Sequence, residues 1–203
     1  MKNIGTYTGA FGLERLLAET CRLQTRQRQV IIAVAGLPGS GKTHLVKNFA
    51  RLGFGPFSRK EVLVIDDNMI YTARLWRLHW QKIQLSKTIW RDFVRSRAHS
   101  VIILANWIPS RKIDFADILV TMTVDETTRH GRLIQRYRGR PDKVPIQQAK
   151  TTIPIEEPFD CQVRMALADF RGEARRWAAT WLLKRQVGKL VGKNRFGSDR
   201  KPT

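Results

Sequence analysis

The run Gly36-Leu37-Pro38-Gly39-Ser40-Gly41-Lys42-Thr43 fits the pattern G-x-x-x-x-G-K-[ST] at every fixed position. A short apolar, β-branched segment, residues 30–35, precedes it, as expected of a buried parallel strand. The segment that follows, residues 44–50, places its apolar side chains on one helical face. A strand, a glycine-rich loop and a helix in this order predict a loop that binds phosphate groups.

The residue types of this loop suit a triphosphate. Its glycines permit φ > 0, so that backbone amides point inward and form an anion nest, which the N-terminus of the next helix reinforces. The lysine can contact the β- and γ-phosphates, and the threonine hydroxyl can bind Mg²⁺. The alternative is an ordinary glycine turn between a strand and a helix. The predicted nucleotide-binding residues are Gly36, Pro38, Gly39, Ser40, Gly41, Lys42, Thr43 and His44, of which Thr43 is also a predicted magnesium ligand.

Charge points to the partner. The 203 residues include 37 Lys and Arg against 17 Asp and Glu, a formal net charge of +20. A site for phosphate groups needs only a few basic residues, whereas a field of this sign attracts polyanions. Nucleic acid, DNA in particular, is therefore the expected partner. A solvated basic surface and an anionic membrane surface are the alternatives.

The rest of the composition predicts a cytoplasmic protein. Cys21 and Cys161 are far apart and outside any metal-type spacing, which favours free thiols in a reducing compartment. The chain has no apolar run of membrane-spanning length and no secretory signal pattern. We expect one domain over residues 1–183 and a basic, partly disordered tail over residues 184–203.

Two adjacent carboxylates follow a second apolar strand. Residues 61–65 run directly into Asp66 and Asp67. In open α/β sheets the ligand crevice lies outside the carboxyl ends of the strands. One carboxylate there can accept the proton of an attacking hydroxyl, and the other, for which we name Asp66, can help to hold magnesium. The sequence leaves open which aspartate is the base, and the alternative is that both cap the next helix.

Residues 69–97 lack proline and glycine and interleave apolar with basic side chains. This pattern predicts one or two helices that form a wall for the acceptor, in which Arg74 holds phosphate and Trp76 stacks on a base. The alternative for each tryptophan is an ordinary place in the core.

Two further strands, residues 100–105 and 118–124, complete the predicted sheet. The first ends in Asn106, which can hydrogen-bond to substrate but brings no charge for magnesium. After the second, Asp125 predicts the start of a helix in which Arg132 and Arg136 share a face. We expect this helix to be a lid whose two arginines neutralise the transferring phosphoryl group. A solvated basic helix and a surface for the acceptor backbone are the alternatives.

The remaining segments predict elements that pack around the sheet. Residues 1–12 indicate a loose arm and residues 13–25 a helix. The prolines of residues 143–158 indicate an extended loop, and spacing from Asp160 onward predicts a long helix containing Val163 and Leu167.

With these residues in place, the chain resembles the small P-loop kinases. The resemblance spans residues 30–140 and implies a three-layer P-loop NTPase fold: a parallel sheet of four to five strands, flanked by helices, with an arginine-rich lid. It implies ATP and Mg²⁺ as cofactors and phosphoryl transfer to a hydroxyl. The implied catalytic residues are Lys42, Asp66, Asp67, Arg132 and Arg136.

Within that group, the chain is most similar in its compact size and its basicity to the bacteriophage 5-hydroxymethyluracil DNA kinases. Such a protein acts in the host cytoplasm and phosphorylates the hydroxymethyl group of the base as part of DNA modification. Polynucleotide 5′-hydroxyl kinases carry an arginine three residues after the second aspartate, and this chain has Ile70 there. The alternatives are such an end kinase, a nucleoside or nucleotide kinase, or a non-catalytic NTP-dependent DNA-binding switch.

Overall fold

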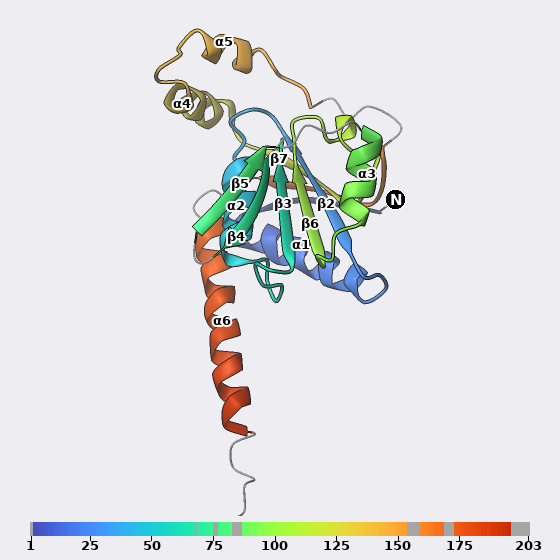
Figure 1. Ribbon diagram of the computed structural model, residues 1–203. Coiled ribbons are helices and arrows are strands. Elements are labelled where there is room, and N and C mark those ends of the chain that lie inside the picture. Colours follow the sequence, from blue (N-terminus) through green and yellow to red (C-terminus); the bar gives the residue numbers. More distant parts are fainter. Residues whose placement is uncertain are drawn as a thin grey trace, which may run out of the picture.

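The computed structural model describes residues 2–67, 69–74, 77–82, 87–153, 159–168 and 173–195. These residues form an α/β fold with one mostly parallel sheet of eight strands (Figure 1). The strands are β1 (Lys2–Thr8), β2 (Val30–Gly36), β3 (Val62–Asp66), β4 (Met69–Arg74), β5 (Arg77–Lys82), β6 (Val101–Ala105), β7 (Phe115–Thr123) and β8 (Asp160–Ala168). The helices are α1 (Gly9–Gln24), α2 (Lys42–Leu52), α3 (Lys87–Arg95), α4 (Glu126–Arg136), α5 (Lys143–Gln148) and α6 (Glu173–Arg195), with a 3₁₀ turn η1 (Pro109–Arg111).

The strand order is β1-β8-β7-β2-β6-β3-β4-β5. The pairings from β1 to β3 are parallel, whereas β4 pairs antiparallel with both β3 and β5. The central strands β2, β3 and β6 are buried along their whole length. Their continuous apolar sequences are those of parallel strands covered on both faces.

Helices cover both faces of the sheet. One core cluster joins the sheet to α1, α2 and α6, for example through Leu16, Phe49 and Trp177. A second joins the other face to α3 through Trp90 and Val94. Burial of these two apolar surfaces is the main favourable term that holds the layers together.

The structure confirms the predicted central elements. Strands β2, β3, β6 and β7 and helices α1, α2 and α4 lie where the sequence places them. The prediction of four to five strands was too small, since four more strands widen the sheet.

Helix was the wrong prediction for residues 69–74 and 77–82. These residues form the antiparallel strands β4 and β5, and among the described residues of the predicted range only those of α3 are helical. Apolar and basic residues that interleave at short intervals fit a two-residue period as well as a helical one.

The predicted long helix from Asp160 was also wrong in its first part. Residues 160–168 form β8, with Cys161, Val163, Met165 and Leu167 alternately buried. Val163 and Leu167 are four residues apart, so their spacing satisfies a strand face and a helix face equally. The helix begins only at Glu173.

Three flanking predictions need correction as well. The supposed loose arm contains β1, a mostly exposed edge strand that pairs with β8. The supposed extended loop contains α5, whose Pro145 lies in the first turn, where helices tolerate proline. The helix α6 runs through residue 184 to Arg195, so the beginning of the predicted tail is helical. No helix in the described part of the chain is long and apolar enough to cross a membrane.

Candidate nucleotide-binding site

The glycine-rich loop, the two aspartates and Asn106 meet at the carboxyl edge of the sheet. Strands β2, β3, β6 and β7 end side by side there, with Asp66 paired to Ala105 of β6 and Gly36 paired to Met122 of β7. The helices α4 and α5 stand beyond this edge (Figure 1). The parallel order thereby brings together segments that are far apart in the sequence.

The glycine-rich loop requires its glycines. Gly39 and Gly41 have φ of 87° and 101°, a region that L side chains rarely adopt. A Cβ on Gly36 would lie 2.7 Å from Ser40 Oγ and 2.9 Å from the Met122 carbonyl oxygen. The loop therefore turns tightly against β7 before α2 begins.

This loop fits an anion. Gly41 is the N-cap of α2 and offers no side chain to the first helical amides. Ser40 Oγ is buried and has no hydrogen-bond partner among the described residues. Buried polar groups normally find partners, so an orphaned hydroxyl beside an uncapped helix N-terminus suits a phosphate group.

Lys42 is folded against this loop. Its ammonium donates to the carbonyl of Gly36 and, at 3.1 Å, to that of Leu37. Burial lowers its pKa to about 8, against the opposing attraction of Asp67 and Asp66. A bound phosphate would supply the negative charge that this buried ammonium lacks.

The two aspartates occupy different environments. Asp66 is buried, and burial raises its pKa although the Thr43 hydroxyl donates a hydrogen bond to it. Asp67 is exposed, has φ of 52°, and donates its backbone amide to the Ala105 carbonyl at 2.9 Å. Asp67 is the one described non-glycine residue with positive φ. Such backbone strain is often found at functional sites.

The two predicted lid arginines of α4 also occupy different environments. Asp125 caps this helix by accepting from the Thr128 amide at 2.7 Å. Arg132 Nη1 donates to the carbonyls of Gly39 and Ser40, both at 3.3 Å. Arg136 is exposed, yet its charge also depresses the pKa of Lys42. The helix thus brings one arginine onto the loop and the other into its electrostatic neighbourhood.

Arg129, on the same helix, is a buried residue that links two helices. It is 2% exposed and makes two hydrogen bonds to Glu126, at 2.6 and 2.8 Å. It also donates to the carbonyls of Gln147 and Gln148 at 3.3 and 2.8 Å. These carbonyls end α5, so Arg129 joins α4 to α5.

Three residues near the site were missed by the sequence analysis. The ammonium of Lys150 lies 4.3 Å from the centroid of the Trp107 ring, and its charge lowers the pKa of Lys42. Lys112 is close enough to Asp67 for that carboxylate to raise its pKa, against a larger lowering by burial. Trp107, Lys112 and Lys150 are single residues in irregular segments, where no spacing pattern indicates a function.

The predicted acceptor residues find less support. Asn106 Oδ1 accepts from the Ile108 amide at 2.8 Å, which explains its position by the local turn. Arg74 ends β4, which runs antiparallel to β3 from Met69 beside Asp66, so the backbone of Arg74 lies toward the edge of the sheet opposite the loop. Its side chain lies outside the described residues, as does all of Trp76. His44 is exposed on the first turn of α2.

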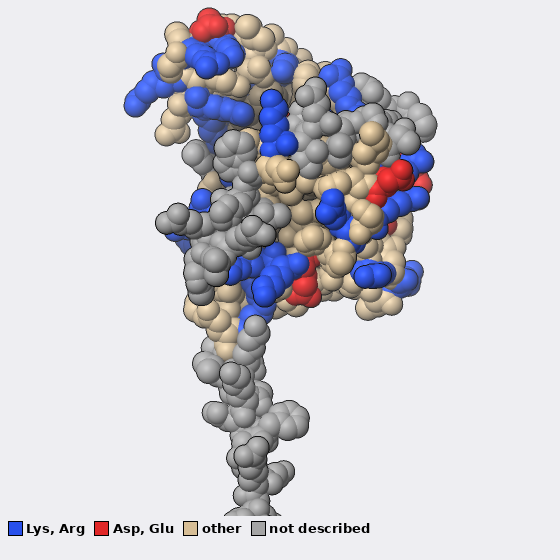
Figure 2. Space-filling view, in the orientation of Figure 1, with Lys and Arg blue, Asp and Glu red and all other residues tan. Residues whose placement is uncertain are grey.

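Charge and metal-binding groups are distributed unevenly. Figure 2 shows that Lys and Arg are frequent on the visible face, especially around α4 and α5, while Asp and Glu are few. Among the described residues, no group of three or more His, Cys, Asp and Glu side chains could hold a metal ion. Magnesium commonly binds through one or two carboxylates plus substrate phosphates, so Thr43 and Asp66 suffice for that kind of site.

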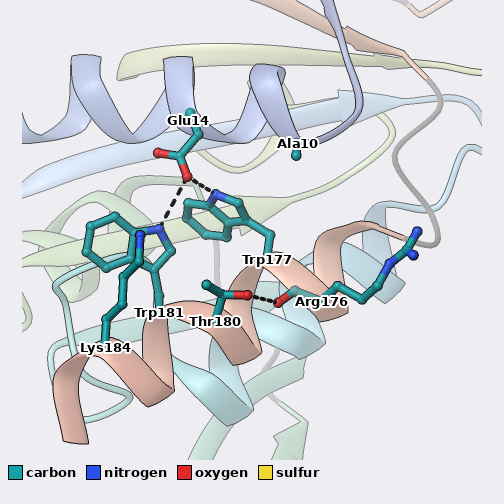
Figure 3. A pocket seen from close by; sticks show the side chains of 7 residues that line it. All are labelled: Ala10, Glu14, Arg176, Trp177, Thr180, Trp181 and Lys184. Atoms are coloured by element: carbon teal, nitrogen blue, oxygen red, sulfur yellow. Dashed lines mark hydrogen bonds between the residues drawn. The ribbon is translucent and has the colours of Figure 1, made fainter. Parts of the chain in front are cut away.

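A separate cavity of about 400 Å³ lies between α1 and α6 (Figure 3). Both indoles, of Trp177 and Trp181, donate to Glu14 Oε1, at 2.5 and 3.4 Å. Lys184 lies over the Trp181 ring, 4.9 Å from its centroid. These groups satisfy one another across the helix junction, and no residue of the glycine-rich loop lines the cavity. We assign it to helix packing.

No model of a known protein family matches this chain, and no curated protein is significantly similar to it.

Proposed function

We propose that this protein is a P-loop kinase that transfers the γ-phosphoryl group of ATP to a hydroxyl on nucleic acid. The observation that carries the proposal is the meeting of Lys42, two aspartates and Arg132 at one sheet edge, around a loop with an orphaned buried hydroxyl. Cation, carboxylate and anion nest are the parts that phosphoryl transfer requires.

The nucleotide is held by the loop and α2. Backbone amides of residues 36–43 and Ser40 Oγ bind the phosphates, and Lys42 leaves its two carbonyl partners to contact them. Arg132 is close enough to follow, since it already lies on the loop. Thr43 and Asp66 would hold Mg²⁺, which when bound neutralises charge on the β- and γ-phosphates.

The environments of the two aspartates favour a division of labour. Asp66 is buried and bonded to Thr43, so it belongs to the magnesium site. Asp67 is exposed and held in place by its backbone, so it accepts the proton of the acceptor hydroxyl. The attacking oxygen then bonds to the γ-phosphorus in line as the bond from phosphorus to the β–γ bridging oxygen breaks, so that ADP leaves, while Lys42, Arg132 and Arg136 neutralise the developing charge.

The net charge of +20 supports a polyanionic acceptor. DNA is the acceptor that we propose, and the hydroxymethyl group of 5-hydroxymethyluracil is the specific hydroxyl suggested by the resemblance. A small-molecule kinase would not need so basic a surface.

The test offers γ-labelled ATP and Mg²⁺ with three acceptors: DNA containing 5-hydroxymethyluracil, unmodified DNA with a 5′-hydroxyl, and free nucleosides. Digestion of the product to nucleotides locates the label. We expect label on the modified base. Label at the 5′ end would indicate an end kinase, label on nucleosides alone would indicate a small-molecule kinase, and no transfer with ATP binding intact would indicate a switch.

A further inference from the structure

Lys150 and Trp107 form a contact beside the glycine-rich loop that the proposed mechanism does not use. Trp107 follows Asn106 at the carboxyl end of β6, and Lys150 follows α5. The Lys150 ammonium lies 4.3 Å from the centroid of the Trp107 ring and donates to Gln147 Oε1 at 2.9 Å. The indole donates to the Thr152 carbonyl at 3.3 Å, which fixes the ring.

The described contacts of Lys150 are all to neutral groups. In the described part of the chain no carboxylate lies within ion-pair distance of its ammonium. The segment that carries Lys150 is nevertheless held at the loop, because Arg129 binds the Gln148 carbonyl and its Cγ would lie 3.1 Å from a Cβ on Gly39. The charge of Lys150 accordingly helps to lower the pKa of Lys42. Two ammonium groups thus repel each other at the place where phosphate charge is expected.

We propose that Lys150 is a phosphate-binding residue that leaves the Trp107 ring and contacts the terminal phosphates when nucleotide binds. The proposal rests on the proposed function, because the nucleotide is its ligand. Lys150 thereby becomes a third cation of the site, supplied by the segment after α5 rather than by α4.

The exchange is favourable because of the partners involved. A charge-assisted hydrogen bond to phosphate is stronger than contact with a neutral ring or amide oxygen. The negative charge of a bound phosphate also offsets the repulsion between Lys150 and Lys42.

The backbone near Lys150 is already positioned for this role. Arg129 donates to the carbonyls of Gln147 and Gln148, three and two residues before Lys150. The anchored helix end leaves the long lysine side chain as the moving part, so the exchange needs no rearrangement of α5. Arg129 acts here as a positioning residue.

The test measures affinity for Mg²⁺·ATP and for AMP by calorimetry, and the tryptophan emission on titration with ATP. We expect Lys150→Ala to weaken ATP binding about ten-fold, as loss of one charged contact does, while AMP binding stays unchanged. Lys150→Arg keeps the charge and should retain most of the affinity. Lys143→Ala, which removes a lysine at the other end of α5, is the matched control and should bind ATP normally.

Emission distinguishes movement of Lys150 from a fixed contact. ATP should change the emission of the wild-type protein, because the ammonium leaves the indole, and this change should be absent from Trp107→Phe and from Lys150→Ala. If Lys150→Ala binds ATP as tightly as Lys143→Ala, the inference fails while the proposed function stands. If the wild-type protein binds no ATP, both fail.

Discussion

At the scale of single residues, Lys42 connects burial to ligand binding. Its ammonium is held against loop carbonyls in a site that lowers its pKa from 10.5 to about 8. Removing a charge from water without a full counter-charge is unfavourable, and a phosphate corrects that deficit. The buried charge of Lys42 therefore destabilises the loop without ligand and favours the binding of a phosphate.

This shift predicts that ATP affinity falls as the pH rises above about 8. In the free protein Lys42 loses its proton above this pH, whereas in the complex with ATP it stays protonated. Binding of ATP must therefore take up a proton. We expect Kd to rise by up to about ten-fold per pH unit between pH 8 and the higher pKa of the complex. Calorimetry from pH 7 to 9.5 measures it, with Lys42→Arg, which stays charged, as the control. Equal affinity at both ends of this range for the wild-type protein would refute it.

The stability of the free protein should move in the opposite direction. The unfolded chain binds more protons than the folded one between the folded pKa of about 8 and the ordinary lysine pKa of 10.5. The contribution of Lys42 to the free energy of unfolding therefore increases with pH across this window. Comparison of Lys42→Met with the wild-type protein isolates that contribution.

The neighbouring aspartates give a second residue-scale prediction. Asp67→Asn, which keeps a side chain that tolerates positive φ, should lower the transfer rate by about 10²–10⁴-fold and leave ATP affinity unchanged. Asp66→Asn should instead raise the Mg²⁺ concentration needed for half-maximal rate, by about ten-fold. Steady-state kinetics at varied Mg²⁺ separates the two, and an Asp67→Asn protein with wild-type rate contradicts the assignment.

At the scale of elements, α4 and α5 behave as one unit because of Arg129. A guanidinium that is 2% exposed satisfies both Glu126 and the last carbonyls of α5.

Arg129→Ala should therefore loosen α5 without unfolding the sheet. Two carbonyls lose their donor, which lowers the local opening free energy by about 2–3 kcal/mol. Hydrogen–deuterium exchange should become faster in residues 143–150 and stay unchanged in β2 and β7. Arg138→Ala, an exposed arginine after α4, is the control. Unchanged exchange in α5 of the Arg129 variant would show that α5 is held by something else.

Elements also show what the sequence could predict. The strands β2, β3, β6 and β7 are apolar runs bounded by turn residues, so pattern was sufficient to find them. In β8, Val163 and Leu167 satisfy two periods, and only the pairing with β7 decides between them. The edge strand β1 has no buried face to give a pattern, so it was invisible.

The site residues, too, include some that the sequence could predict and some that it could not. Lys42, Asp66 and Arg132 follow predicted strands, so the parallel topology was enough to bring them together. The contacts of Arg129 and Lys150 depend on how α5 packs against α4, and neither residue type nor spacing carries that information.

At the scale of the whole molecule, basic charge should govern DNA binding. Residues 187–203 hold five basic residues and one acidic residue. Their removal should weaken DNA binding at moderate salt and reduce the slope of log Kd against log salt concentration. The truncation must leave Arg185, which donates to the carbonyls of Leu52 and Phe57 and so fastens α6 to the end of α2.

Fluorescence anisotropy with labelled DNA at several salt concentrations measures this slope, and ATP affinity is the control that should not change. A truncated protein with the wild-type slope would show that DNA contacts other surfaces.

Transfer of label from γ-labelled ATP to DNA containing 5-hydroxymethyluracil, compared between the wild-type protein and Lys42→Ala, tests the account most directly. We predict labelled DNA with the wild-type protein and with Lys60→Ala, which alters an exposed lysine beyond α2, and none with Lys42→Ala. Equal labelling by Lys42→Ala, or no transfer by the wild-type protein to any nucleic-acid hydroxyl, would contradict it.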